Sequence, residues 1–127
     1  MNAPTGLHYA QSHEWVKLEG GIATIGVTKF AVEQLTEPTF LELAKVGKSV
    51  KVSEEIGVIE SVKSTSSIYA PIPGDVVEVN KAALDNLALV NDDPFGAGWL
   101  LKLKVSPDVS LDHLLDATQY DAQIAGH

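Results

Sequence analysis

The chain has 127 residues, no cysteine and a formal net charge of −8. Its length suits one domain spanning residues 1–127, and the lack of cysteine excludes disulfide scaffolds, thiolate nucleophiles and cysteine-based zinc sites. An acidic surface repels phosphate backbones, and no apolar run approaches the roughly 20 residues of a membrane-spanning helix, so neither nucleic acid nor a membrane is an expected partner.

The N-terminal segment MNAPTGLHYAQSHEW has no targeting pattern. It shows neither the apolar core of a signal peptide nor the arginine-rich amphipathic character of a transit peptide. We therefore expect a cytoplasmic bacterial protein, and a mitochondrial matrix protein only if the chain is a processed form. We also expect a monomer.

Most of residues 7–105 has the pattern of a β body, with short β-prone stretches separated by glycine, proline and asparagine. The first of these stretches lie at 15–18, 22–27 and 40–43. A hairpin turn is predicted at 19–21, where two glycines follow a glutamate. Residues 29–35 have helical spacing with Thr28 as a cap, which predicts one short helix among the strands.

A weak internal repeat follows, because VGKSVKVS at 46–53 resembles PGDVVEVN at 73–80. Each copy has a turn glycine and then alternating valines, which predicts two related hairpin units packed face to face. Residues 80–90 predict a loop with a helical turn, and residues 99–105 predict a strand with alternating leucines and lysines.

The C-terminal segment, about 106–124, changes to helical spacing. Ser106 followed by Pro107 is typical of a helix start, and several leucines then fall on one helical face. Asp116 is a candidate cap for a second short turn. We therefore expect C-terminal helices near 107–124 that cover an apolar edge of the β body.

Enzyme signatures are missing from the sequence. It contains no GxGxxG, GxxxxGK[ST], GxSxG or HExxH. The four histidines are scattered, without the i, i+4 spacing of a helical metal site. We predict no catalytic residue and no metal ligand.

Lys63 lies in the polar stretch 60–67, between two runs rich in valine and isoleucine. The flanking runs predict the two arms of a hairpin, with the amine of Lys63 held in solvent at its apex. A modifying enzyme would find the amine accessible there. Spacing alone leaves two interpretations open, a modified lysine or an ordinary solvated lysine in a loop.

Several motifs in order and spacing resemble the H proteins of the glycine cleavage system. They are SHEW at 12–15, ATIGVT at 23–28, ESVKS at 60–64, YAPIPGDVVEVN at 69–80 and LVNDDPFGAGWLLKLK at 89–104. The ESVK segment differs from the lipoyl domains of 2-oxo acid dehydrogenases, which resemble DKA at this turn, and from biotin carriers, which resemble MKM. The resemblance implies a mainly β fold, a barrel-sandwich hybrid of the lipoyl and biotinyl type with two antiparallel sheets.

The resemblance implies that Lys63 is the lipoylated lysine of the family. Lipoate joined covalently to Lys63 through an amide would supply the redox sulfur that a cysteine-free chain lacks, on an arm that reaches about 10 to 15 Å. The neighbouring residues are implied as the turn that lipoate-attaching enzymes recognise: Glu60, Ser61, Val62 and Ser64.

The implied function is that of a carrier and not of an enzyme. The family shuttles the aminomethyl group of glycine from glycine decarboxylase, a pyridoxal-phosphate enzyme, to a tetrahydrofolate-dependent aminomethyltransferase and then meets dihydrolipoyl dehydrogenase. Two alternatives stay open. One is an H-like paralogue that relays lipoate to other lipoyl enzymes, and the other is an unmodified binding module of the same fold.

The family holds the loaded arm against the protein body with the serine and glutamate of the SHEW segment, which map onto Ser12 and Glu14. A carboxylate beside an ammonium group favours the charged form of the amine. Many members have an aspartate shortly after the modified lysine, and this chain has Ser67 at that position. We therefore expect a cleft with one carboxylate fewer.

A second departure from the family lies at 35–47, where LTEPTFLELAKVG replaces a pattern that resembles LGDIVFVELPEVG. The residues that differ most in kind are Thr36, Pro38 and Ala44. Because proline cannot donate to a sheet ladder, we expect Pro38 at a sheet edge or at a bulge.

Overall fold

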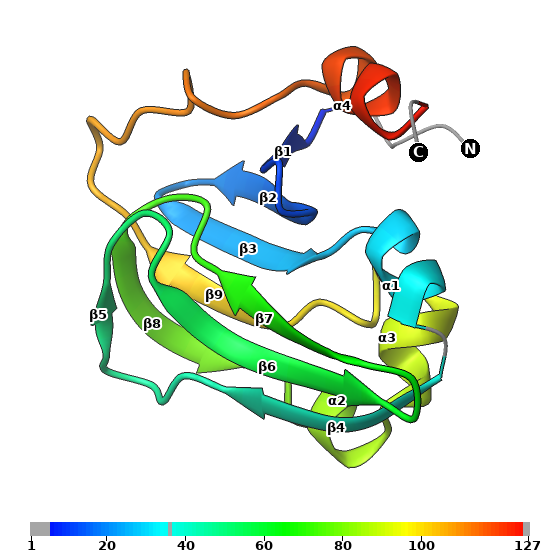
Figure 1. Cartoon of the computed structure of the whole chain (residues 1–127). Helices are drawn as coiled ribbons and strands as arrows, with labels where there is room; N and C mark the ends of the chain where they lie inside the picture. The colour runs from blue at the N-terminus through cyan, green and yellow to red at the C-terminus, as the bar shows by residue number, and fades with distance from the viewer. Residues whose placement is uncertain (1–5, 36, 126–127) are drawn as a thin grey trace.

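The computed structural model describes residues 6–35 and 37–125, which form strands and short helices in the arrangement of Figure 1. Thr36 lies outside the described residues. The elements in chain order are β1 (His8–Tyr9), β2 (Glu14–Glu19), β3 (Ile22–Val27), α1 (Lys29–Leu35), β4 (Pro38–Leu43), β5 (Ser49–Val50), β6 (Glu55–Ser61), β7 (Thr65–Tyr69), β8 (Gly74–Val79), α2 (Lys81–Asp85), α3 (Ala88–Asp92), β9 (Leu101–Lys104) and α4 (Ala117–Ile124).

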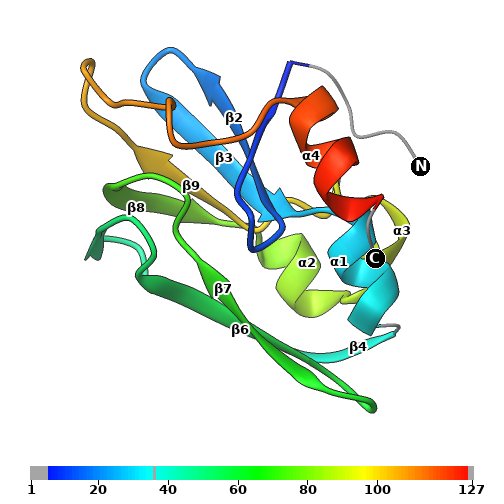
Figure 2. The same ribbon diagram turned by 45° about the horizontal axis from the view of Figure 1, so that its top comes forward.

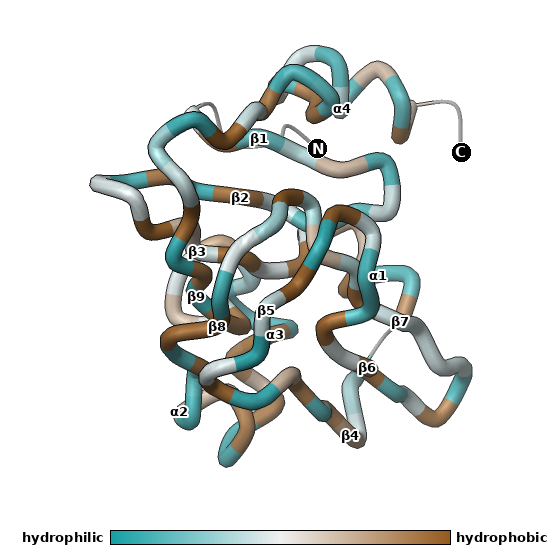
Figure 3. Tube along the Cα trace, turned by 90° about the vertical axis from the view of Figure 1, so that its left-hand side faces the viewer, coloured by the Kyte–Doolittle hydropathy of each residue, from teal (hydrophilic) through white to brown (hydrophobic). Residues whose placement is uncertain are grey.

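The strands form two antiparallel sheets, one with the order β1-β2-β3-β9-β8-β5 and the other with the order β4-β6-β7. One hydrophobic core joins them, because buried Ile25 and Leu101 of the first sheet pack in the same cluster as Ile59 and Ile68 of the second. This is the mainly β, two-sheet fold expected from the sequence. Figure 3 shows the hydrophobic and hydrophilic residues that alternate along the strands.

Local sequence signals explain several elements. Gly20 and Gly21 both have positive φ, +56° and +83°, and close the predicted hairpin between β2 and β3. Helix α1 covers 29–35 as predicted, and Oγ1 of Thr28 accepts a hydrogen bond from the backbone N–H of Ala31 (3.3 Å). Pro38 begins the edge strand β4 beside a bulge, which confirms its expected position.

The two copies of the internal repeat do not pack face to face, so that prediction is wrong. β5 and β8 are neighbours in one sheet, with Ser49 opposite Asp75 and Val50 opposite Gly74. Gly74 begins β8 instead of forming a turn. The position needs glycine, because a Cβ atom there would lie 2.8 Å from the carbonyl oxygen of Lys104. Gly74 thus allows close contact with β9, whereas Gly47, the corresponding glycine of the first copy, has no atom close to the position of a Cβ.

The C-terminal segment contains a shorter helical part than predicted, because only α4 is helical between 107 and 124. Leu115 instead pairs with Tyr9 through two backbone hydrogen bonds of 2.8 and 2.7 Å, and this long-range bridge holds the chain extended. Asp116 caps α4 as predicted, in a capping box with Gln119. The segment and α4 lie over β1 (Figure 2).

Two smaller differences concern residues 80–104. The predicted single helical turn at 80–90 is two short helices, α2 and α3, the first capped by the side chain of Asn80. β9 begins at Leu101 and not at residue 99, with its leucines buried and its lysines turned outward. Within the described residues, no helix is long and apolar enough to span a membrane.

Candidate functional site

Lys63 lies in the three-residue connection between β6 and β7, a hairpin whose tip projects beyond the protein body (Figures 1 and 2). The backbone N–H of Ser61 donates to the carbonyl oxygen of Ser64 (2.8 Å) and closes the turn. Val62 is 89% exposed, and Lys63 is exposed too. The structure thus places the amine at the solvent-facing apex that the sequence predicted.

The side chain of Ser61 fixes the shape of this turn. Its Oγ accepts the backbone N–H groups of both Lys63 and Ser64, each over 3.2 Å. Beneath the turn, Oγ1 of Thr65 donates to Oε1 of Glu60 (3.3 Å). The hydrogen bonds hold the backbone while the side chain of Lys63 stays accessible, which is a suitable geometry for recognition by another protein.

A pocket of about 350 Å³ lies beside the hairpin. One wall is formed by residues 12–14, a second by α1 and a third by residues 64–68 at the start of β7 and within it. We call this pocket the arm cleft. It brings together four of the site residues predicted from the sequence, which are far apart in the chain: Ser12, Glu14, Ser64 and Ser67.

Glu14 is the most deeply buried polar group of the arm cleft, with 1% of its surface exposed. Its carboxylate accepts hydrogen bonds from Oγ of Ser12 and from the backbone N–H of Tyr69, the latter over 3.1 Å. Burial raises the pKa of Glu14 to about 7, against the opposing effect of these hydrogen bonds. The ion pairs found among the described residues do not include Glu14, so a cation brought into the cleft would meet an acceptor.

The dimensions of the arm cleft fit a lipoyl-lysine arm. Ser67 follows Lys63 by four residues, a strand distance of at most about 13 Å at roughly 3.3 Å per residue, and the arm reaches about 10 to 15 Å. Val27, Leu35 and Ile59 supply apolar wall that suits an alkyl chain. The carboxylate of Glu14 is hydrogen-bonded to the backbone of Tyr69, two residues beyond Ser67 along β7.

Sequence reasoning missed several residues of the arm cleft, among them His13, Phe30 and Gln34. The ring of Phe30 lies 4.9 Å from that of His13, between centroids. Phe30 and Gln34 are one helical turn apart, so their shared face was available as a signal. No local signal indicates that this face of α1 lines the same pocket as β7.

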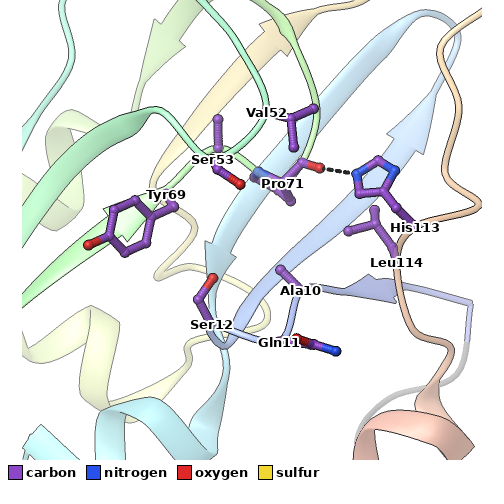
Figure 4. A pocket seen from close by; sticks show the side chains of 10 residues that line it. Ala10, Gln11, Ser12, Val52, Ser53, Tyr69, Pro71, His113 and Leu114 are labelled. Carbon is purple, nitrogen blue, oxygen red and sulfur yellow. Dashed lines mark hydrogen bonds between the residues drawn. The ribbon is translucent and has the colours of Figure 1, made fainter.

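A second pocket, of about 420 Å³, lies next to the arm cleft and shares Ser12 with it (Figure 4). The C-terminal segment forms one side, where a ring nitrogen of His113, Nε2, is hydrogen-bonded to the carbonyl oxygen of Pro71 (2.7 Å). Lys63 is not among its lining residues. In the described part of the chain, no group of three or more histidine, aspartate or glutamate side chains is placed to hold a metal ion.

Residues 7–127 match the family model of the glycine cleavage H-protein. The chain belongs to this family. The glycine cleavage system H proteins of Gloeothece citriformis (strain PCC 7424) and of Symbiobacterium thermophilum are 51% and 48% identical to it. The first alignment covers 97% of this chain and 95% of the relative, and the second covers 95% and 94%.

The fold is similar to that of a solved H protein. The crystal structure of a glycine cleavage system H protein from Mycobacterium marinum has a TM-score of 0.89 to this chain at 37% identity. The match covers 97% of this chain and 99% of the other. Members of the H-protein family are lipoyl carriers without catalysis of their own, so the expectation of a carrier that is not an enzyme is confirmed. A lipoate relay for other enzymes is not favoured by these comparisons.

Proposed function

We propose that this chain carries the aminomethyl group of glycine on a lipoyl group attached to Lys63. It would receive the group at the pyridoxal-phosphate decarboxylase, deliver it to the tetrahydrofolate-dependent aminomethyltransferase and then visit dihydrolipoyl dehydrogenase. The observation that carries the proposal is that Lys63 stands at the tip of a hairpin whose second strand lines a cleft ending at the buried carboxylate of Glu14.

Lys63 would form the attachment point. When bound there, lipoate supplies a dithiolane that takes up and releases the aminomethyl group and is afterwards reoxidised. The rigid turn held by Ser61 presents the lysine to lipoate-attaching enzymes, with Glu60, Val62 and Ser64 beside it. Tethering replaces free diffusion between partner enzymes by a local search at high effective concentration.

Glu14 and Ser12 would hold the loaded arm, by which we mean the arm bearing the aminomethyl group. The ammonium end of that arm is attracted to the carboxylate of Glu14, and the charge of the ammonium lowers the pKa of this carboxyl group from about 7 so that it stays ionised. Ser12 donates to the same carboxylate and keeps it oriented. Ser67 lines the cleft with a neutral hydroxyl, so Glu14 would be the one carboxylate of the cleft lining that attracts the ammonium group.

The acidic balance of the chain would guide it onto partners with basic surfaces. The formal net charge of −8 is spread over a chain of 127 residues, and such complementarity raises association rates more than it raises affinity. Exposed Val62 adds an apolar contact at the hairpin tip. A cytoplasmic location and a monomeric state remain predictions that cell fractionation and light scattering would check.

Reconstitution with a glycine decarboxylase tests the proposal. The lipoylated chain should support exchange of labelled bicarbonate into the carboxyl group of glycine, and Lys63→Ala should abolish it. Lys45→Ala is the matched control, because Lys45 is also exposed but lies in the connection after β4, away from the hairpin. A lipoylated wild-type chain that supports no exchange would contradict the proposed function.

A further inference from the structure

Tyr120 connects helix α4 to two distant segments of the chain. Its side chain is 1% exposed and stacks on Tyr9, with ring centroids 4.8 Å apart. Its hydroxyl lies 2.7 Å from Nδ1 of His13 and 2.6 Å from Oγ1 of Thr28. Burial raises the pKa of Tyr120 to about 12, so the hydroxyl stays protonated and can both donate and accept hydrogen bonds.

His13 belongs to the wall of the arm cleft that carries Glu14. Its φ is +76°, in the left-handed region that residues other than glycine seldom occupy. Its backbone N–H donates to the carbonyl oxygen of Ala10 (3.0 Å), and its own carbonyl accepts from the N–H of Thr28 (2.9 Å). The hydrogen bond to Tyr120 adds a side-chain restraint, and the residue that it restrains directly precedes Glu14.

Thr28 directly precedes α1, the helix that forms the second wall of the arm cleft. It is 1% exposed, and its Oγ1 caps the helix by accepting from the backbone N–H of Ala31. The same oxygen contacts the hydroxyl of Tyr120. Phe30, two residues later, contacts the ring of His13, and both residues line the arm cleft. Holding Thr28 in place therefore holds the first turn of α1 relative to the wall of residues 12–14.

We propose that the hydroxyl of Tyr120 positions the arm cleft by holding the wall of residues 12–14 and the wall of α1 at a fixed separation. Tyr120 is not among the residues described as lining the cleft, so it acts through His13 and Thr28 as a positioning residue. This inference rests on the proposed function. It assigns to the C-terminal helix a part in excluding water from the loaded arm.

Tyr120→Phe removes one oxygen atom and keeps the ring that stacks on Tyr9. Tyr9→Phe is the matched control, because it removes a second buried hydroxyl from the same aromatic stack, outside the chain of hydrogen bonds that joins His13, Tyr120 and Thr28. Both variants should fold, since each ring stays in place. Circular dichroism and thermal melts would establish this before the measurements below.

The first measurement is the titration of Glu14 in the unmodified protein, followed through the side-chain carboxyl carbon by NMR and assigned with Glu14→Gln. If Tyr120→Phe loosens the walls and admits water, the titration midpoint of Glu14 should fall from about 7 toward its ordinary range. A loss of global stability alone leaves the midpoint of the folded state unchanged. An unchanged midpoint in Tyr120→Phe, or an equal fall in Tyr9→Phe, would overturn the proposal.

The second measurement is the decay of the loaded arm in the lipoylated protein. Water adds to the aminomethyl carbon, and the bonds from this carbon to sulfur and to nitrogen both break. The thiol returns, and formaldehyde and ammonium are released. Tyr120→Phe should accelerate this release at least about three- to tenfold, the factor expected for one hydrogen bond, because the hydroxyl makes two. Tyr9→Phe should match wild type. Equal rates in Tyr120→Phe and wild type would contradict the proposal.

A double-mutant cycle with Thr28→Val tests the route of the effect. If Tyr120 acts through Thr28, the two substitutions together should change the Glu14 midpoint by less than the sum of their separate effects. Additive effects would overturn this route. The titration needs no lipoate, so it tests the positioning role of Tyr120 separately from the carrier function. A chain that fails to carry the aminomethyl group would refute the proposed function, and the effect of Tyr120 on Glu14 could still be measured.

Discussion

The carboxylate of Glu14 accepts a hydrogen bond of 3.1 Å from the backbone N–H of Tyr69, although the two residues are 55 positions apart. Tyr69 ends β7, and β7 begins two residues after Lys63. One strand of fixed length therefore separates the proposed attachment point from a buried carboxylate. Six residues of extended chain span at most about 20 Å, and an arm of about 10 to 15 Å covers half to three quarters of that path.

Replacement of Glu14 should expose the loaded arm. Glu14→Gln keeps the size of the side chain but removes the charge, so the release of ammonia and formaldehyde should accelerate at least about tenfold, the scale of a lost charged hydrogen bond. Lipoylation of Lys63 should be unchanged. Glu33→Gln, an exposed change on α1, is the control. Equal decay in the Glu14 variant and wild type would remove Glu14 from the mechanism.

The raised pKa of Glu14 predicts a dependence of stability on pH. Its pKa is 4.5 in the unfolded chain and about 7 in the folded protein, so the folded state binds more protons between these values. The contribution of Glu14 to the free energy of unfolding is therefore fully present below 4.5 and is lost as pH rises to about 7, by about 3 kcal/mol in total.

Urea titrations of wild type and Glu14→Gln at a series of pH values would measure this loss. The difference between the two free energies of unfolding should change across pH 4.5 to 7 and stay constant above that range. A difference that is flat from pH 4 to pH 8 would show that Glu14 has an ordinary pKa in the folded protein.

Ser61 should control presentation of the lysine. Ser61→Ala removes the acceptor of two backbone N–H groups, so the turn should become mobile and the rate of lipoylation should fall several-fold. The cost in stability should be at most about 1 kcal/mol, because the turn is exposed. Ser49→Ala, a change on β5, removes a hydroxyl that is hydrogen-bonded to Asp75 of β8 and should have no effect on lipoylation. Unchanged kinetics in both variants would contradict a role for Ser61.

Ser67→Asp should restore the second carboxylate of the arm cleft. A like charge beside Glu14 disfavours ionisation, so the pKa of Glu14 in the unmodified protein should rise above 7. The loaded arm should decay more slowly, because two carboxylates attract its ammonium. Ser110→Asp is the control, because Ser110 is exposed and is not among the residues that line the arm cleft. NMR titration and formaldehyde release would test both parts.

The elements predicted correctly from the sequence have causes that are local in the chain. Two glycines close the turn between β2 and β3, Thr28 caps α1, and the proline at position 38 excludes an interior strand. The hairpin that displays Lys63 follows from two apolar runs around a polar stretch. Motif resemblance then supplied the interpretation that spacing left open, lipoylation of Lys63, and this stays a prediction.

The predictions from the sequence that proved wrong concern segments that pair with distant parts of the chain. Backbone hydrogen bonds between Leu115 and Tyr9 keep residues before α4 extended despite their helical spacing. The two repeat copies pair edge to edge through β5 and β8, and Gly74 of the second copy is in close contact with β9. The contribution of Tyr120 to the arm cleft also depends on long-range contacts, to His13 and Thr28, that no local pattern indicates.

The central claim is that Lys63 carries the lipoyl arm, and mass spectrometry tests it most directly. The chain would be treated with a lipoate-attaching enzyme, measured intact and then digested to locate the modification. We predict one lipoyl adduct, on the peptide that contains Lys63, and none in Lys63→Arg. An unmodified wild-type chain, or an adduct that persists in Lys63→Arg, would contradict the claim.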